Sequence, residues 1–263
     1  MPDVREALSP LLVNRPHMAH LLADGISARV RLGLIVLATD FTIEYEWRRI
    51  MSGLAGVGLY HSRIMNSSQI TPETLKAMEG DITGAAGLLL PQQPFGVVAY
   101  GCTSASMVIG EDKVTTLIQA AHPEARVTTP VTAARAAFQA LGMKRIALLT
   151  PYVQSINDLM RAYFEQRGIP VPVMGSFNIM DDGLVARLSA DSVKQAALEL
   201  GRHPDVDGVF VSCTSVRLAD VVEELEAELG KPVTSSNHAM AWHTLRLGGV
   251  KEAIPGFGRL LRL

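Results

Sequence analysis

Short runs of apolar, often β-branched residues alternate along the chain with longer segments of helical periodicity. Runs that are apolar at consecutive positions suit strands covered on both faces, as in a parallel sheet flanked by helices. The alternation of such runs with helices predicts an α/β fold. The predicted strands are residues 30–37, 57–64, 96–100, 126–129, 145–149, 170–176, 208–212 and 232–235.

Helix-start and helix-end residues separate several of these runs. A helix is predicted to begin at Thr71, where an N-cap hydroxyl is followed by a proline and an acidic residue. Helical segments at 133–141 and 220–229 each end at a glycine, a residue that commonly terminates helices.

Two stretches of sequence occur twice in similar form. Residues 97–104 and 209–215 both run from a strand into Cys-Thr-Ser, and residues 32–40 and 145–152 both run from a strand into small polar residues. Two similar halves are therefore predicted, with a boundary near residues 129 and 130. Because ligands of open α/β sheets bind beyond the carboxyl ends of the strands, the four turns are expected to meet in one cleft.

Composition and charge narrow the class of partner. Of 263 residues, 48% are hydrophobic and 19% charged, so the chain can bury a large core without disulfide or metal support. A formal charge of -2 offers no general attraction for nucleic acid or an anionic membrane, which favours a small molecule. With no signal-like or membrane-length apolar run, the protein is expected to be cytoplasmic. The apolar excess also favours a homo-oligomer.

The two cysteines, Cys102 and Cys213, occupy matching positions after a strand and before Thr-Ser and an expected helix. A thiol at a helix N-terminus is stabilised as thiolate, the form that acts as nucleophile or base. A structural disulfide is not expected in a reducing cytosol. The alternative is that both are inert core residues. No Cys-x-x-Cys pair is present, and His238 and His243 are spaced too far apart for one helix face, so no metal site is predicted.

Hydroxyl groups flank both thiols. Thr103, Ser104, Thr214 and Ser215, with the backbone amides of their turns, could bind a carboxylate or a developing oxyanion, or could simply cap helices. Tyr152 follows a predicted strand, where its phenol could donate to a substrate carboxylate or pack in the core.

Polar residues near other predicted strand ends and the C-terminus are weaker candidates. Asp40 and Glu44 could orient a thiol or bind a substrate cation, or could be an N-cap and a solvated helix residue. Asn237 is expected to cap the last helix, and Arg259 to bind a carboxylate or face water.

Together these residues resemble the maleate isomerase and arylmalonate decarboxylase branch of the aspartate/glutamate racemase superfamily. The resemblance implies two pseudo-symmetric Rossmann-like domains with the active site between them. The first, residues 1–129 with 236–263, would carry Cys102, and the second, residues 130–235, would carry Cys213. The matching segments are 36–44, 100–104, 145–157, 207–215, 230–236 and the final Pro-Gly-Phe-Gly-Arg-Leu-Leu.

The resemblance also implies a reaction without metal or organic cofactor. One thiol would add to the double bond of a cis-dicarboxylate, or the two would exchange an α-proton across opposite faces of a small carboxylic or amino acid. The decarboxylase relatives keep only the second cysteine, so Cys102 makes decarboxylation by Cys213 the second hypothesis. A third is a ligand-binding module that is not an enzyme.

The match is broken at Asp40, because maleate isomerases carry an asparagine there that binds a substrate carboxylate. An aspartate would repel that group and favour an ammonium-bearing, amino-acid-like substrate. Some members of the branch are encoded with ectoine-utilisation enzymes, whose intermediates are of this kind. Residues 1–28 exceed the family core and are expected to pack on the first domain or on a neighbouring subunit.

Overall fold

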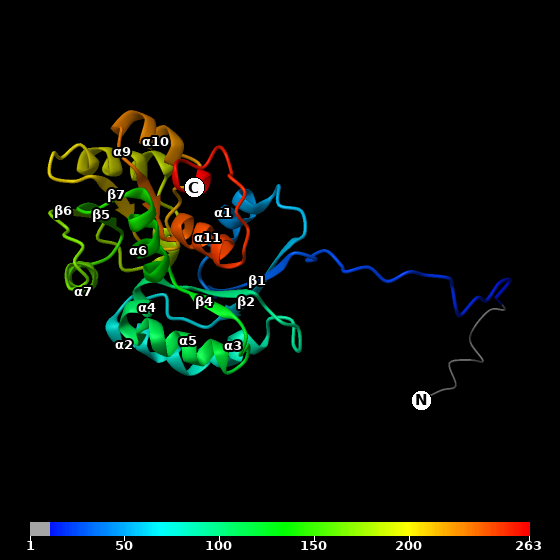
Figure 1. Ribbon diagram of the computed structural model, residues 1–263. Helices are drawn as coiled ribbons and strands as arrows, with labels where there is room; N and C mark the ends of the chain where they lie inside the picture. The colour runs from blue at the N-terminus through cyan, green and yellow to red at the C-terminus, as the bar shows by residue number, and fades with distance from the viewer. Residues whose placement is uncertain (1–10) are drawn as a thin grey trace.

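A computed structural model describes residues 11–263, which form two four-stranded parallel sheets with helices around them (Figure 1). The first sheet has the order β2-β1-β3-β4 and the second β6-β5-β7-β8. The strands are β1 (Val30–Leu37), β2 (Val57–Ile64), β3 (Val97–Gly101), β4 (Arg126–Thr128), β5 (Ile146–Thr150), β6 (Val173–Ser176), β7 (Gly208–Val211) and β8 (Val233–Ser235).

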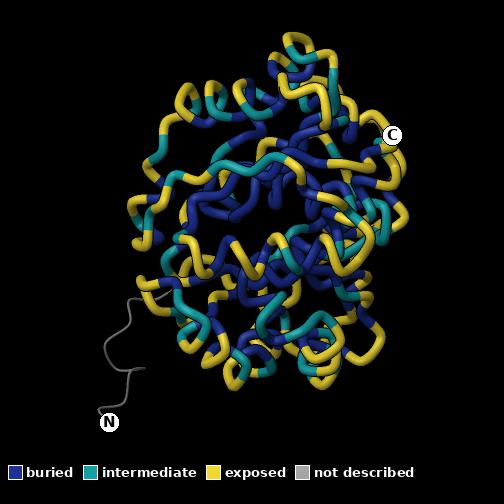
Figure 2. The backbone as a smooth tube through the Cα atoms, turned by 90° about the vertical axis from the view of Figure 1, so that its left-hand side faces the viewer, coloured by how far each residue is buried: buried dark blue, intermediate teal, exposed yellow. Residues whose placement is uncertain are grey.

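The α/β prediction and the internal repeat are confirmed, because each strand of the first sheet has a counterpart at the same place in the second. In both sheets the first strand of the half lies beside the third, with Leu34 opposite Ala99 and Leu148 opposite Phe210. All eight predicted strands are present, and the largest difference is at β6, which begins at Val173 instead of 170. The buried backbone fills the interior of both halves, and the exposed backbone lies on the outer helices and loops (Figure 2).

The predicted helix ends follow the expected chemistry, with one exception. The Thr71 side chain accepts from the N–H of Thr74, and Gly142 and Gly230 end their helices with φ of 71° and 69°. The last helix is capped by Ser235, so the prediction that Asn237 caps it is wrong. The helices are α1 (Ile43–Met51), α2 (Pro72–Ala77), α3 (Ile82–Gly87), α4 (Thr103–Ile109), α5 (Glu111–Gln119), α6 (Pro130–Leu141), α7 (Gln154–Glu165), α8 (Asp182–Val185), α9 (Ala190–Gly201), α10 (Val222–Leu229) and α11 (Ser236–Leu247), with 3₁₀ turns at Met78–Asp81 and Leu260–Arg262.

Helix α11 follows the second sheet in sequence but packs on α6, on α1 and on β3 of the first sheet. Its residues Ala239, Met240 and Leu245 are fully buried in the same apolar cluster as Leu32 and Leu34 of β1. The chain thus returns to the first half after completing the second. The proposed domain boundaries at 129/130 and 235/236 remain a prediction.

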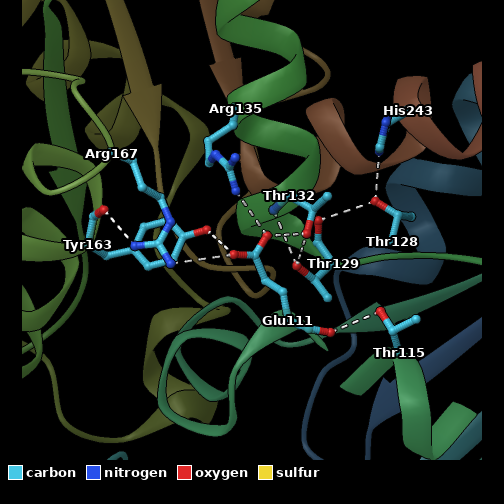
Figure 3. A network of polar contacts seen from close by, with 9 residues as sticks. All are labelled: Glu111, Thr115, Thr128, Thr129, Thr132, Arg135, Tyr163, Arg167 and His243. Carbon is cyan, nitrogen blue, oxygen red and sulfur yellow. Dashed lines mark hydrogen bonds and ion pairs between the residues drawn. The ribbon is translucent and has the colours of Figure 1, made fainter. Parts of the chain in front are cut away.

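Glu111, the first residue of α5, ties the two halves together (Figure 3). Its carboxylate accepts hydrogen bonds of 2.5 Å from Thr132 on α6 and from Tyr163 on α7. The guanidinium groups of Arg135 and Arg167 lie 3.4 and 3.8 Å from the same carboxylate. One acidic side chain therefore connects three helices.

Residues 11–26 form an exposed arm that extends away from the body of the molecule (Figure 1). Leu12 and Leu21 are almost fully exposed, and the arm does not pack on the first domain. Residues 1–10 lie outside the described part of the chain, and a contact between the segment 1–28 and a neighbouring subunit stays a prediction. No helix within residues 11–263 is long and apolar enough to span a membrane.

Candidate active site

One pocket lies between the two halves, where the carboxyl ends of their parallel strands meet. Its wall includes Leu37 at the end of β1 and Cys102 directly after β3. From the second half come Tyr152, which follows β5, and Cys213, which follows β7. The structure therefore brings together the two predicted thiols and the predicted tyrosine in one cavity.

Cys102 is the N-cap residue of α4 and is almost completely buried. Burial raises the pKa of its thiol to about 12, and the carboxylates of Asp182 and Asp40 add to this effect. The backbone N–H of Ala105 and the hydroxyl of Ser104 oppose it, with Ser104 Oγ 3.9 Å from Cys102 Sγ. The helix N-terminus assists the thiolate as predicted, but desolvation is the larger effect.

Cys213 differs from Cys102 in its backbone. It has φ of 93°, in the left-handed region that is uncommon for residues other than glycine. The prediction that a helix follows it directly is wrong, because a loop continues to α10 at Val222. Burial, and next the Asp182 carboxylate, raise the pKa of Cys213 well above its usual range, whereas hydrogen bonds to Ser215 N–H and Tyr152 lower it.

Both thiols are consequently protonated in the pocket at neutral pH. At each cysteine, burial outweighs the hydrogen bonds that favour the thiolate, so the pKa is raised and not lowered. Formation of a thiolate here requires either a proton acceptor or a compensating positive charge nearby.

The hydroxyls next to the thiols bond to other parts of the protein, and that of Thr214 joins the two halves. Thr103 donates to Ser236 Oγ at 2.9 Å, and the same oxygen accepts from the backbone N–H of Cys213 at 3.1 Å. Thr214 donates to the carbonyl of Gly101 at 3.3 Å. Thr103, Ser104 and Thr214 line the pocket. Their predicted role in substrate binding stays a prediction.

Tyr152 is 2% exposed and lies against Cys213. Asn157 donates to its carbonyl at 2.9 Å, and its own N–H donates to Thr150 Oγ1 at 3.2 Å, so its backbone is fixed. Burial raises the pKa of the phenol well above its usual range. The hydroxyl therefore stays protonated and is available as a donor.

Asp40 lies behind the pocket wall, buried beside the N-terminus of α1. Its Oδ1 accepts from the N–H groups of Thr42 and Ile43 at 2.7 and 3.0 Å. The N-cap residue of α1 is Thr42, so the prediction that Asp40 is the N-cap is wrong, although its side chain bonds the start of this helix. Its Oδ2 is buried and has no hydrogen-bond partner among the described residues. Burial raises the pKa of this carboxyl. Glu44 instead forms an ion pair with Arg63 on β2 and does not line the pocket.

Asp182, the first residue of α8, was not predicted, although it lines the pocket and is 3% exposed. Its two oxygens accept from Thr39 at 2.6 Å and from Ser215 at 2.8 Å. Ser215 thus lies behind the pocket wall, bonded to this carboxylate. Among the described residues that line the pocket, none is Lys, Arg or His.

The same rule that located Cys102 would have pointed to Asp182 and Asn66, because Asn66 follows β2 and Asp182 lies in the segment after β6. The repeated stretches of sequence cover only the ends of the first and third strands of each half. They therefore do not include Asn66 or Asp182. Within residues 11–263 no three His, Cys, Asp or Glu side chains gather as a metal site. The expectation that no cofactor takes part stays a prediction.

Comparisons with known proteins agree with this geometry. A family model described as arylmalonate decarboxylase matches residues 55–261. A maleate isomerase of Nocardia farcinica is 30% identical over 241 residues, covering 88% of this chain and 95% of its own. An arylmalonate decarboxylase of Bordetella bronchiseptica is 32% identical over 237 residues, with coverages of 87% and 95%.

Solved structures give the same result. The maleate isomerase of Pseudomonas putida S16 with maleate superposes with a TM-score of 0.81 at 26% identity, covering 89% of this chain and 97% of its own. A mutant of the Nocardia farcinica maleate cis-trans isomerase with a covalently bound succinylcysteine intermediate also has a TM-score of 0.81, at 28% identity with coverages of 89% and 98%.

Proposed function

The chain belongs to the arylmalonate decarboxylase family, and we propose that it is a cofactor-independent isomerase in which Cys102 and Cys213 act on one small carboxylic or amino acid. The observation that carries the proposal is that both thiols line a single pocket, one from each half of the molecule. A relative holds a covalent succinylcysteine, which supports direct cysteine chemistry.

Two isomerisations use this arrangement. In a racemisation, the thiolate of one cysteine takes the α-proton from one face, and the thiol of the other returns a proton to the opposite face. In a cis-trans isomerisation, a thiolate adds to one alkene carbon and the negative charge passes to the neighbouring carbon. Rotation then occurs about the carbon-carbon bond that was the double bond. The thiolate leaves again as the double bond re-forms. Each scheme needs one thiolate. The cis-trans isomerisation returns both cysteines to their starting state, whereas the racemisation exchanges their protonation states, so that the site is then set for the reverse direction.

The charges around the pocket favour a substrate that carries a cation. Asp182 lines the pocket, Asp40 lies close behind it, and no basic side chain is among the described lining residues. A second carboxylate on the substrate would be repelled at this end, whereas an ammonium group would be attracted. The same positive charge would oppose the effect of both carboxylates on the thiols and so promote thiolate. We therefore place an amino-acid-like substrate with its ammonium group toward Asp182, with racemisation or epimerisation as the reaction.

Decarboxylation is the second candidate, supported by the Bordetella bronchiseptica relative. It would use Cys213 alone to protonate the carbanion that remains after loss of CO2. The presence of a second thiol in the pocket favours isomerisation over this reaction.

The test is proton NMR in D2O with a panel of aspartate and glutamate enantiomers, diaminobutyrate derivatives, maleate and an arylmalonate. For the parent, solvent deuterium at the reacting carbon of both stereoisomers is expected. Cys102→Ser and Cys213→Ser should each abolish the interconversion and retain exchange of one stereoisomer only. Conversion of maleate to fumarate would establish the cis-trans reaction instead. Loss of CO2 that depends on Cys213 alone would contradict the isomerase proposal.

A further inference from the structure

A buried carboxylate outside the pocket holds the loop that carries Cys213. Glu46 lies on α1 and is 1% exposed. Its Oε1 accepts from the backbone N–H groups of Leu218 and Ala219, both at 2.7 Å. An acidic side chain from the first half is thus bonded to the backbone of the second.

Two other side chains also bind the loop of residues 214–219. Asn237 of α11 donates from Nδ2 to Glu46 Oε2 at 2.8 Å and to the carbonyl of Thr214 at 2.6 Å. Thr42, one turn before Glu46, donates to the carbonyl of Ser215 at 3.0 Å. The backbone between residues 214 and 219 is therefore bonded at four points from helices of other parts of the chain.

These hydrogen bonds matter because of the backbone conformation of Cys213. A cysteine with φ of 93° is strained, and such a conformation persists only where the surroundings fix it. On one side of Cys213 is the strand β7, and on the other is the loop bonded to Glu46 and Asn237. Release of the loop would let the residue relax and turn its thiol away from the pocket.

We propose that Glu46 is a positioning residue whose ionised carboxylate holds the 214–219 loop, and through it the thiol of Cys213, in the working geometry. The role in catalysis rests on the proposed function, but the effect on the thiol does not. The carboxylate form accepts from all three donors with charge-assisted hydrogen bonds, whereas protonation removes the charge and places a hydrogen on one of the two accepting oxygens.

The ionisation of Glu46 falls in an accessible pH range. Burial raises its pKa to about 7, against the hydrogen bonds from Ala219, Asn237 and Leu218, and the carboxylate of Asp220 raises it further. Asp220 is itself paired with Arg49 at 2.8 Å and Tyr45 at 3.0 Å. On α11, the nearby His238 is engaged by Thr234 and by the carbonyl of Phe257. Since the pKa of Glu46 is raised to about 7, its carboxylate holds the loop above that pH. The charged contact is lost as the pH falls below it.

The experiment measures alkylation of Cys213 by iodoacetamide in a Cys102→Ala background, which needs no knowledge of the substrate. Glu46→Gln keeps the shape of the side chain but removes its charge. It is expected to expose Cys213 and raise the alkylation rate at pH 8 on the order of tenfold. The ratio of the two rates should fall toward one below pH 7, because the parent is then protonated as well. Glu44→Gln, on the same helix but paired with Arg63, should leave the rate unchanged.

In the enzyme with both cysteines, Glu46→Gln should lower kcat on the order of 100-fold with little change in KM, because a displaced thiol affects the chemical step. The parent should show an acidic limb near pH 7 that the variant lacks, and Glu46→Asp should restore part of the activity. Alkylation that is unchanged within about twofold by Glu46→Gln, with the fold intact by thermal unfolding, would overturn the proposal. If the variant does not fold, the pH dependence of the parent decides. A rate of Cys213 alkylation whose slope against pH does not change near pH 7 would overturn the proposal. Changed alkylation in a protein that isomerises nothing would retain the positioning role and reject the proposed function.

Discussion

Thr39, at the end of the first strand of the first half, donates a hydrogen bond of 2.6 Å to Asp182 of the second half. Asp182 lines the pocket, and next to it in sequence Asp181 pairs with Gln69 as an isolated antiparallel bridge. A carboxylate that lines the pocket is therefore held by the contact that joins the halves. Any charge that the substrate presents at this side must be compatible with Asp182.

Replacing Asp182 by Asn should change which substrates are accepted. The amide keeps the shape of the side chain but not its charge, so kcat/KM for an ammonium-bearing substrate is expected to fall on the order of 100-fold. Asp181→Asn is the matched control. Asp181 is adjacent in sequence, but its side chain caps α8 and does not line the pocket. Steady-state kinetics on both variants make the comparison. An equal loss for charged and uncharged substrates would argue against a cation site.

Each thiol should have its own stereochemical signature. In a racemase, Cys102→Ser and Cys213→Ser are each expected to lower interconversion on the order of 1,000-fold, because proton transfer to one face is lost. Each variant should still exchange the α-proton of one enantiomer, and the two variants should differ in which one. Deuterium incorporation measured separately for each enantiomer tests this. Exchange of the same enantiomer in both variants would contradict the assignment of one thiol to each face.

Much of the fold was predictable because the strands are largely buried on both faces, so that runs such as residues 32–37 carry no polar side chain. The two thiols were predictable because both follow strands. Glu46 was not, because in sequence it is one acidic residue between apolar neighbours on a helix. Its burial depends on Leu218 and Ala219, more than 170 residues away in the chain. The left-handed backbone of Cys213 likewise depends on contacts that no local pattern records.

The reactivity of the thiols follows from their burial. Because the pKa of Cys102 is raised to about 12, and that of Cys213 is raised further, the resting protein should react with iodoacetamide at pH 7 more slowly than the same protein unfolded in guanidinium. Above pH 7, where Glu46 is ionised, the rate should increase about tenfold per pH unit, since the thiolate fraction does. Faster alkylation of the folded protein at pH 7 would show that the site lowers the pKa of its thiols.

The contact at Glu111 predicts a stability effect without a direct effect on chemistry, because Glu111 does not line the pocket. Glu111→Gln leaves one donor facing Thr132 or Tyr163, and removes the charge that pairs with Arg135 and Arg167. Hydrogen bonds to a charged, mostly buried group contribute more than neutral ones, so the free energy of unfolding should fall by about 2 kcal/mol.

Urea unfolding, followed by far-UV circular dichroism, measures the change at Glu111. Glu165→Gln is the control, because Glu165 forms an exposed ion pair with Arg161 one turn away on α7, and such pairs contribute little. A loss at Glu111 with a reduced m-value would mean that the halves now unfold separately, since m follows the surface exposed in one transition. An unchanged midpoint would show that Thr132 and Tyr163 hold the halves together without the carboxylate.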